Sequence, residues 1–254
     1  MMRATDGQEA HLQSACYELD RYQQTHPDPV RAFAFRDLRD SLPDFEQRLV
    51  RIDSILPPDD FRDLATEIEG LVETERSYLP AHKKGGTVAY RTLRENAPNT
   101  VALYLSNDLR DLVSQIVGQR VGPTPTHDQS SCSILFYDRP GDHIGWHYDH
   151  NFYRGQHLTV LIPIINMGHG PDGLSAARLE AQIEGETRVL PTPPNTMVVF
   201  EGQKILHRVT PIAQGERRVI LSMTFASDAS ASLLQGVKRR IKDTAFFGVK
   251  ALWT

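Results

Sequence analysis

His147 and Asp149 stand two positions apart, and a third candidate metal ligand, His207, follows in a distant stretch of the chain. On an extended strand, side chains two positions apart leave the same face of the backbone, so the first two can converge on one ion. Two imidazoles and one carboxylate form a facial iron site that leaves coordination positions free. The fold therefore has to bring two distant segments to one point.

Short runs of β-branched and aromatic residues, separated by Gly, Pro and Asn, dominate the second half of the chain. Such runs predict strands, and several at this spacing are typical of a double-stranded β-helix of the jelly-roll or cupin type. The predicted strands are 132–137, 157–166, 187–190, 196–200 and 218–225, with an earlier one at 48–56.

The first third is predicted to be mainly helical. Apolar residues recur at helical spacing from Pro57 to about Arg76, and Ser106 or Asn107 can cap a later helix. The predicted helices are 9–25, 29–42, 57–76 and 106–117, with a mostly helical tail at 227–254. We expect an α+β fold in which residues 1–125 form a mainly helical part packed on the barrel. Residues 126–254 form the β-helix core and its tail, in one compact domain.

The composition of the chain limits the kinds of molecule that the protein is expected to bind. A net charge of -4 and a pI near 6.2 disfavour binding to a nucleic-acid backbone. The first ten residues lack the apolar core of a secretory signal, and no segment approaches the roughly 20 apolar residues of a membrane span, so we expect a cytoplasmic protein. Cys16 and Cys132 have no metal-ligand spacing. The tail could cover the barrel or the partner subunit of a homodimer.

Three segments within residues 131–225 form an ordered set. They are Tyr137-Asp-Arg-Pro-Gly141 leading into His147-Tyr-Asp149, then Pro194-Asn-Thr-Met-Val-Val-Phe200, then His207-Arg-Val-Thr-Pro-Ile-Ala-Gln-Gly-Glu-Arg217. Together they resemble the Fe(II)/2-oxoglutarate-dependent oxygenases, in particular their prolyl-4-hydroxylase-like branch. The resemblance implies Fe(II), 2-oxoglutarate and O2 as cofactors and cosubstrates, with His147, Asp149 and His207 as the iron ligands.

The same resemblance implies a site for 2-oxoglutarate. Arg217 would bind its distal carboxylate, because the guanidinium fork can form two parallel charge-assisted hydrogen bonds. Arg218 is the alternative, since only one of two adjacent strand residues can point into a barrel, and the family spacing favours Arg217. Tyr137 lies against the cosubstrate in this interpretation, although core packing would explain it equally well.

A narrower resemblance is to the free-amino-acid hydroxylases and radical halogenases of this superfamily, which include the lysine halogenases. It rests on the overall size, the helical N-terminal portion and the segment Tyr78-Leu-Pro-Ala-His-Lys83-Lys84-Gly85-Gly86-Thr-Val. In the halogenating members a glycine replaces the carboxylate ligand, and chloride occupies the vacated position. This chain has Asp149 there, so the resemblance implies hydroxylation.

Several residues near these motifs are candidates for substrate binding. Residues 83–86 could form a mobile lid with glycine hinges, in which a lysine or Arg91 pairs with a substrate carboxylate, or simply a solvated loop. The candidates, each of which could equally serve packing, are Lys84, Arg91, Trp146, His150, Asn151 and Thr224.

The predicted function is hydroxylation of an unactivated C–H bond in a small molecule, a free amino acid or a related metabolite. Three alternatives stay open at this point. They are a hydroxylase of protein or peptide residues, a nucleic-acid demethylase, and a cupin-like metal-binding module that catalyses no oxidation.

Overall fold

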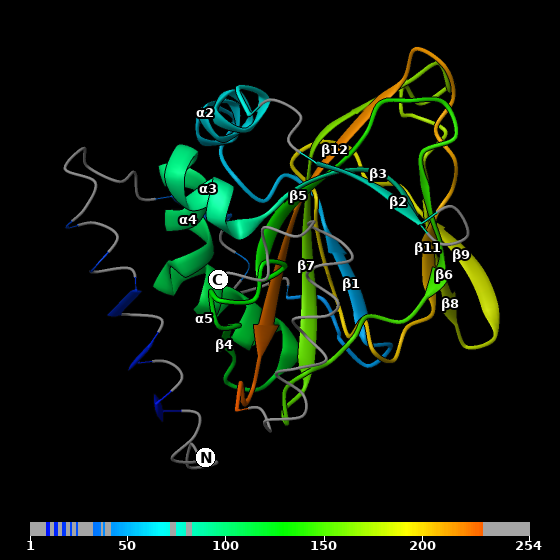
Figure 1. Cartoon of the computed structure of the whole chain (residues 1–254). Helices are drawn as coiled ribbons and strands as arrows, with labels where there is room; N and C mark the ends of the chain where they lie inside the picture. The colour runs from blue at the N-terminus through cyan, green and yellow to red at the C-terminus, as the bar shows by residue number, and fades with distance from the viewer. Residues whose placement is uncertain are drawn as a thin grey trace.

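A curled antiparallel sheet with helices on one side forms the described part of this computed structural model (Figure 1). The structure describes residues 42–71, 75–79 and 83–230, together with short stretches and single positions between residues 9 and 38. The helices are α2 (Pro58–Glu69), α3 (Tyr90–Asn96), α4 (Pro98–Leu105) and α5 (Asn107–Val117). The strands are β1 (Leu49–Ile52), β2 (Glu75–Leu79), β3 (Lys83–Val88), β4 (Gly122–Pro123), β5 (Cys132–Tyr137), β6 (His143–His147), β7 (His157–Met167), β8 (Leu179–Ile183), β9 (Glu186–Leu190), β10 (Met197–Phe200), β11 (His207–Val209) and β12 (Arg217–Ala226).

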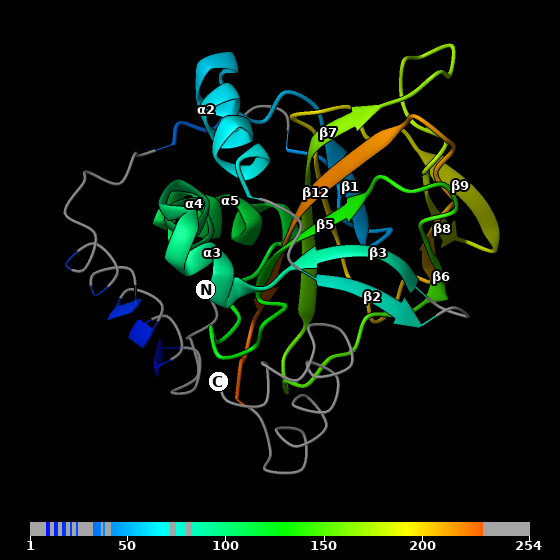
Figure 2. The same cartoon turned by 45° about the horizontal axis from the view of Figure 1, so that its top comes forward.

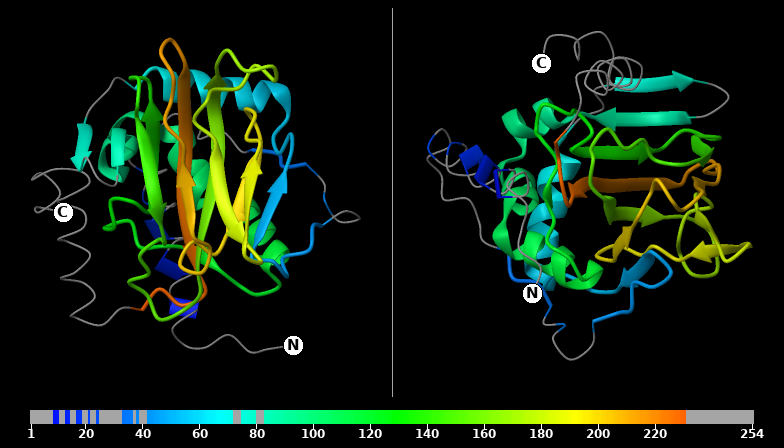
Figure 3. Two further views of the ribbon diagram at one scale, coloured as in Figure 1. Left: turned by 90° about the vertical axis from the view of Figure 1, so that its right-hand side faces the viewer. Right: turned by 90° about the horizontal axis from the view of Figure 1, so that it is seen from below.

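The strand order shows how the sheet closes on itself. The order is β1-β10-β7-β12-β5-β3-β6-β11-β8-β9, with β2 on β3 and β4 on β12, and all pairings are antiparallel. The helices cover the outer face of β5, β7 and β12, while β6, β11, β8 and β9 curl away from the helices (Figures 2 and 3). This is the predicted double-stranded β-helix with helices packed on it.

Two apolar cores lie on opposite faces of the longest strands. On β12, Val219, Leu221 and Met223 pack in one cluster with residues of the helices. Ile220 packs in another cluster with residues of β7, β8 and β10, between the two halves of the curled sheet. Successive side chains of a strand point to opposite faces. Odd-numbered residues of β12 therefore face the helices, and even-numbered residues point into the interior of the curled sheet.

Helix α5 follows the sequence prediction closely. Its cap is Ser106, whose hydroxyl accepts the backbone N–H of Leu109 at 3.2 Å. Strands β1, β5, β7, β9, β10 and β12 fall within one or two residues of the predicted runs or inside them. The described residues between 9 and 24 are helical, as predicted. Beyond Ser230, the predicted helical tail lies outside the described residues.

Two helix predictions need correction. The segment predicted as helix 29–42 is not helical at described residues 33–36, because the N–H groups of Ala34 and Arg36 bond to Asp60 and to the carbonyl of Ile55 instead of to their own turn. Helix 57–76 ends at Glu69, before Gly70, and residues 75–79 form β2. Helices α3 and α4 and strands β6, β8 and β11 were not predicted.

Residues 83–86, predicted as a lid or a solvated loop, belong to strand β3 between β5 and β6. A Cβ added to Gly86 would lie 1.8 Å from the ring of Phe136. The glycine therefore lets an aromatic ring pack directly on the backbone, and it serves close packing instead of a hinge.

The boundary proposed at residue 125 stays a prediction, although β1, β2 and β3 precede it and belong to the sheet. Cys132 is buried on β5, and Cys16 lies outside the described residues. None of the helices in the described ranges has the length and apolar character that a membrane span requires.

Candidate metal centre

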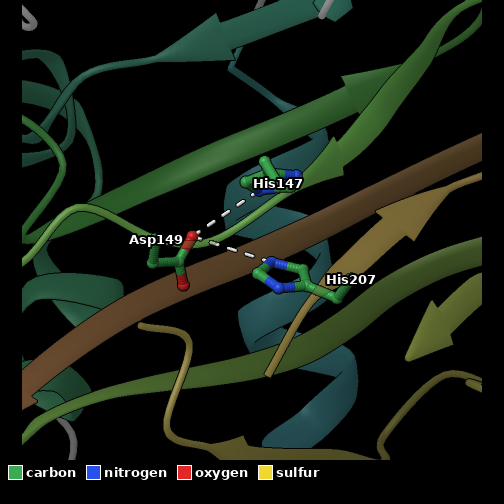
Figure 4. A group of neighbouring side chains, drawn as sticks. All are labelled: His147, Asp149 and His207. Atoms are coloured by element: carbon green, nitrogen blue, oxygen red, sulfur yellow. Dashed lines mark ion pairs between the residues drawn. The ribbon is translucent and has the colours of Figure 1, made fainter. Parts of the chain in front are cut away.

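The three predicted metal ligands meet where β6 and β11 pair (Figure 4). His147 is the last residue of β6, His207 is the first residue of β11, and their Cα atoms are register partners. Asp149 follows β6, and its Oδ1 lies 3.6 Å from the Nε2 atom of each histidine. One ligand atom from each residue lies within 4.8 Å of the others. This spacing suits three ligands on one face of one ion.

Backbone carbonyls orient both imidazoles. The Nδ1 atom of His147 lies 2.8 Å from the carbonyl oxygen of Gly145, and that of His207 lies 2.9 Å from the carbonyl oxygen of Ile205. A carbonyl can only accept, so each Nδ1 carries the hydrogen and each Nε2 lone pair faces Asp149. Both tautomers are thus set for binding a metal through Nε2.

Electrostatics give the site the right protonation state for a cation. Burial lowers the pKa of His207 below its usual value, which keeps this imidazole neutral. Burial by itself raises the pKa of Asp149, but the neighbouring His147 and His207 and the hydroxyl of Thr159 favour the ionised carboxylate and hold its pKa well below the usual range. A neutral imidazole and an ionised carboxylate are the forms that ligate divalent iron.

A second polar group lies inside the barrel at the start of β12. Arg218 is 1% exposed, pairs in register with Tyr137 of β5, and its guanidinium lies 5.7 Å from the tyrosine ring centroid. Nη2 lies 3.4 Å from the hydroxyl of Thr192, whereas Nε and the Tyr137 hydroxyl have no hydrogen-bond partner. Burial lowers the pKa of Arg218 to about 10. No carboxylate of the described residues pairs with this buried cation.

The structure places Arg217 on the other face of β12, where the family spacing did not expect it. Arg217 is exposed and lines a cavity with Ile68 of α2 and Val219, whereas Arg218 shares the inward parity of Ile220. A side chain on the helix-covered face cannot reach the barrel interior. Arg218 therefore replaces Arg217 as the candidate for binding an anionic cosubstrate.

The family model for Halogenase D matches residues 34–169, which is more than half of the chain and includes His147 and Asp149. The chain belongs to the Halogenase D family. A comparison with curated proteins finds no match.

Solved structures similar to this Halogenase D family member share its fold at low identity. The epimerase SnoN, in complex with Fe3+, alpha ketoglutarate and nogalamycin RO, has a TM-score of 0.58 at 10% identity over 72% of this chain and 80% of SnoN. An oxidoreductase of the 2OG-Fe(II) oxygenase family from Burkholderia pseudomallei has 0.55 at 14% identity, covering 91% and 98%. A prolyl hydroxylase from Trichoplax adhaerens, in complex with a hypoxia inducible factor peptide fragment, has 0.54 at 12% identity, covering 84% and 93%. The chain thus has the fold of the 2-oxoglutarate-dependent Fe(II) oxygenases.

Three of the substrate candidates lie on outer faces of this family member. Trp146 stacks with the guanidinium of Arg208, 4.6 Å from the ring centroid, on the face opposite to His147. Arg91 is exposed on α3 and pairs with Glu95. Lys84 shares the parity of Val88, which packs against the helices. None of these three side chains is directed towards the metal centre.

The other candidates have structural partners. His150 is exposed and stacks on Phe152. The amide of Asn151 donates to the carbonyl of Gly155 and the side chain of Gln203, which shapes the loop after the metal dyad. The hydroxyl of Thr224 lies 2.5 Å from that of Thr124. These contacts give each of the three side chains a structural partner, and their role in substrate binding stays a prediction.

Two residues at the centre were missed in the sequence. Thr159 of β7 donates its hydroxyl to Oδ2 of Asp149 at 2.5 Å, and the carbonyl of Gly202 accepts the Asp149 N–H at 3.0 Å. A threonine within a β-branched strand and a glycine in a turn carry no sequence signal for this role. Only the packing of β7 and of the turn after β10 against the Asp149 loop identifies them.

Proposed function

We propose that this chain is a 2-oxoglutarate-dependent Fe(II) oxygenase that hydroxylates an unactivated C–H bond of a small molecule, with a free amino acid as the first candidate. The observation that supports it best is that this fold contains both a metal site with open coordination positions and a buried cation that needs an anion. A three-ligand cluster leaves one face of a metal free, and a buried arginine without a carboxylate partner among the described residues needs an anion.

The residues present fit both groups. His147, Asp149 and His207 would hold Fe(II), and Arg218 would bind the distal carboxylate of 2-oxoglutarate through its free Nε and one Nη. The Tyr137 hydroxyl, which has no other partner, would donate to the same carboxylate. When bound, iron and 2-oxoglutarate couple decarboxylation to succinate and CO2 with insertion of one O2 oxygen into a C–H bond. The chain positions both reactants and excludes water around them.

Asp149 argues for hydroxylation within a family described as halogenases. Halogenation by this superfamily needs a position beside the metal for the halide, and in the halogenating members that position is opened by a glycine. Here Asp149 fills it, with both carboxylate oxygens engaged by neighbouring groups. We therefore propose oxygen insertion and no halide transfer in the natural chain.

A small substrate fits a recessed centre better than a polypeptide does. The side chains of His207, His147 and Asp149 are 8%, 18% and 24% exposed. Ligand sites for small molecules are concave and bury most of the ligand, whereas a peptide needs an open groove. The resemblance to free-amino-acid hydroxylases supports the same choice.

Succinate release tests the proposal. Purified protein with Fe(II), ascorbate, O2 and 2-oxoglutarate should release succinate in proportion to hydroxylated product for at least one of the twenty amino acids. His207→Ala should release none. Coupled turnover with proline-containing peptides alone would establish the peptide hydroxylase instead. Absence of succinate with every amino acid and peptide would leave a metal-binding module.

A further inference from the structure

The carboxylate of Asp149 has two oxygens with different surroundings. Oδ1 faces the two Nε2 atoms at 3.6 Å each, whereas Oδ2 accepts the hydroxyl of Thr159 at 2.5 Å. Thr159 lies on β7, in register with Phe200 of β10 on one side and Thr224 of β12 on the other. Pairing on both sides holds the backbone of Thr159, and the hydrogen bond to Oδ2 orients its hydroxyl.

Gly202 closes the other side of the same carboxylate. Its carbonyl accepts the Asp149 N–H at 3.0 Å, and a Cβ added to it would lie 1.9 Å from Oδ2. Gly202 is not among the glycines with positive φ, so an alanine is allowed by the backbone and excluded by the carboxylate alone. The absence of a side chain here makes room for Oδ2 against the turn.

The turn that carries Gly202 is anchored from several elements. Glu201 is 4% exposed, and its carboxylate accepts Arg48 at 3.0 Å, Gln156 at 3.2 Å and Gln203 at 3.3 Å. These partners come from the segment before β1, from the residue before β7 and from the turn itself. A buried carboxylate with three donors resists displacement, so Gly202 stands on a rigid support.

We propose that Thr159 and Gly202 form a carboxylate clamp that keeps Asp149 a one-oxygen ligand. With Oδ2 tied to Thr159 and blocked by Gly202, only Oδ1 can reach the ion. A carboxylate bound through both oxygens would take one more coordination position and leave fewer for cosubstrate and O2. Thr159 and Gly202 are thus positioning residues, and this inference rests on the proposed metal binding at His147, Asp149 and His207.

The experiment titrates Co(II) into metal-free protein and records both affinity and the visible absorption of the bound ion, which depends on coordination number and geometry. Thr159→Val removes the hydroxyl at nearly constant shape, and Thr159→Ser keeps it. Loss of a hydrogen bond to a metal ligand lowers metal affinity by about 10- to 100-fold. We expect that loss and an altered spectrum in Thr159→Val, near wild-type values in Thr159→Ser, and the larger defect in Gly202→Ala.

Thr100→Val is the matched control, because the hydroxyl of Thr100 donates to the carboxylate of Glu67 at 2.6 Å in the helical layer. It should shift the urea midpoint of the metal-free protein without changing Co(II) affinity or spectrum. Equal affinity and spectrum in Thr159→Val and wild type would overturn the clamp. If the wild type binds no Co(II), or if His207→Ala binds it as well as the wild type does, the metal site itself is refuted. The proposed function is then refuted with it.

Discussion

Replacing Arg218 by methionine should stabilise the protein without 2-oxoglutarate and strongly reduce its stabilisation by 2-oxoglutarate. A pKa of about 10 in place of the ordinary 12.5 means that the folded interior disfavours the charged guanidinium by about 3 kcal/mol. The contact with the Tyr137 ring offsets about 1 kcal/mol of this, and the 3.4 Å contact with Thr192 adds little. Methionine removes the charge and fills a similar volume, so we expect a gain of about 2 kcal/mol.

The effect on 2-oxoglutarate has the opposite sign. Removing one partner of a buried, hydrogen-bonded charge pair costs about 3 kcal/mol of binding, which is roughly 100-fold in affinity. At a concentration 100 times the wild-type Kd, 2-oxoglutarate should stabilise the wild type by about 2.7 kcal/mol and Arg218→Met by only about 0.4 kcal/mol. Urea unfolding of both proteins, with Ni(II) in place of Fe(II), measures the free energy of unfolding without 2-oxoglutarate. Repeating it with 2-oxoglutarate measures the stabilisation that the cosubstrate adds.

Arg217→Met is the matched control on the same strand. Arg217 is exposed on the outer face, so its replacement should change the free energy of unfolding by less than about 0.5 kcal/mol and leave the 2-oxoglutarate response intact. The reasoning is refuted if Arg217→Met loses the response while Arg218→Met keeps it. It is also refuted if Arg218→Met lowers the stability of the protein without 2-oxoglutarate by several kcal/mol.

Three further predictions concern the ligand carboxylate, a buried loop anchor and the packing of β3. Asp149→Gly should lose hydroxylation and, with chloride, give a chlorinated product by mass spectrometry; abundant chlorination by the wild type would contradict our assignment. Glu216→Gln should cost about 2 kcal/mol in urea unfolding, because the buried carboxylate accepts backbone N–H groups from two loops. Burial raises the pKa of Glu216, but these hydrogen bonds hold it below the ordinary value of 4.5. Its contribution is therefore complete above that ordinary value and disappears as the pH falls through the lower folded value; a stability difference between wild type and Glu216→Gln that stays constant as the pH falls would refute this. Gly86→Ala should cost about 1–3 kcal/mol by overpacking against Phe136, and an unchanged thermal midpoint would contradict the proposed role of the glycine.

The metal ligands could be predicted because their chemistry restricts residue type and spacing. The two-residue spacing of His147 and Asp149 is weak evidence by itself, because other pairs in the chain share it. The ordered motifs around this pair and around His207 made the prediction specific. The structure adds the backbone carbonyls of Gly145 and Ile205, which set the tautomers of His147 and His207. Any residue offers a backbone carbonyl, so the sequence carries no signal for these acceptors.

The choice between Arg217 and Arg218 could not be made from the sequence. An amphipathic strand shows its inner face by alternating apolar and polar residues, but β12 continues as Val219, Ile220 and Leu221, with apolar residues on both faces. Helices cover one face and the curled sheet covers the other, so the parity is readable only once the helices are placed. Helices α3 and α4 were missed for a related reason, since α4 is apolar on nearly all sides and shows no helical stripe.

Polar side chains between the two halves of the sheet lower the stability of this fold, and they are the groups that the proposed chemistry needs. The core beneath the helices is built from aliphatic and aromatic side chains of α2–α5, β5, β7 and β12. Between the two halves of the sheet, the same strands turn Thr159, Tyr137 and Arg218 inward, two of which keep buried polar atoms without a partner. Each such atom costs about 1–3 kcal/mol until a ligand satisfies it. An interior filled with aliphatic side chains would be more stable, so these polar residues support the proposed binding of an anion and a metal between the two halves of the sheet.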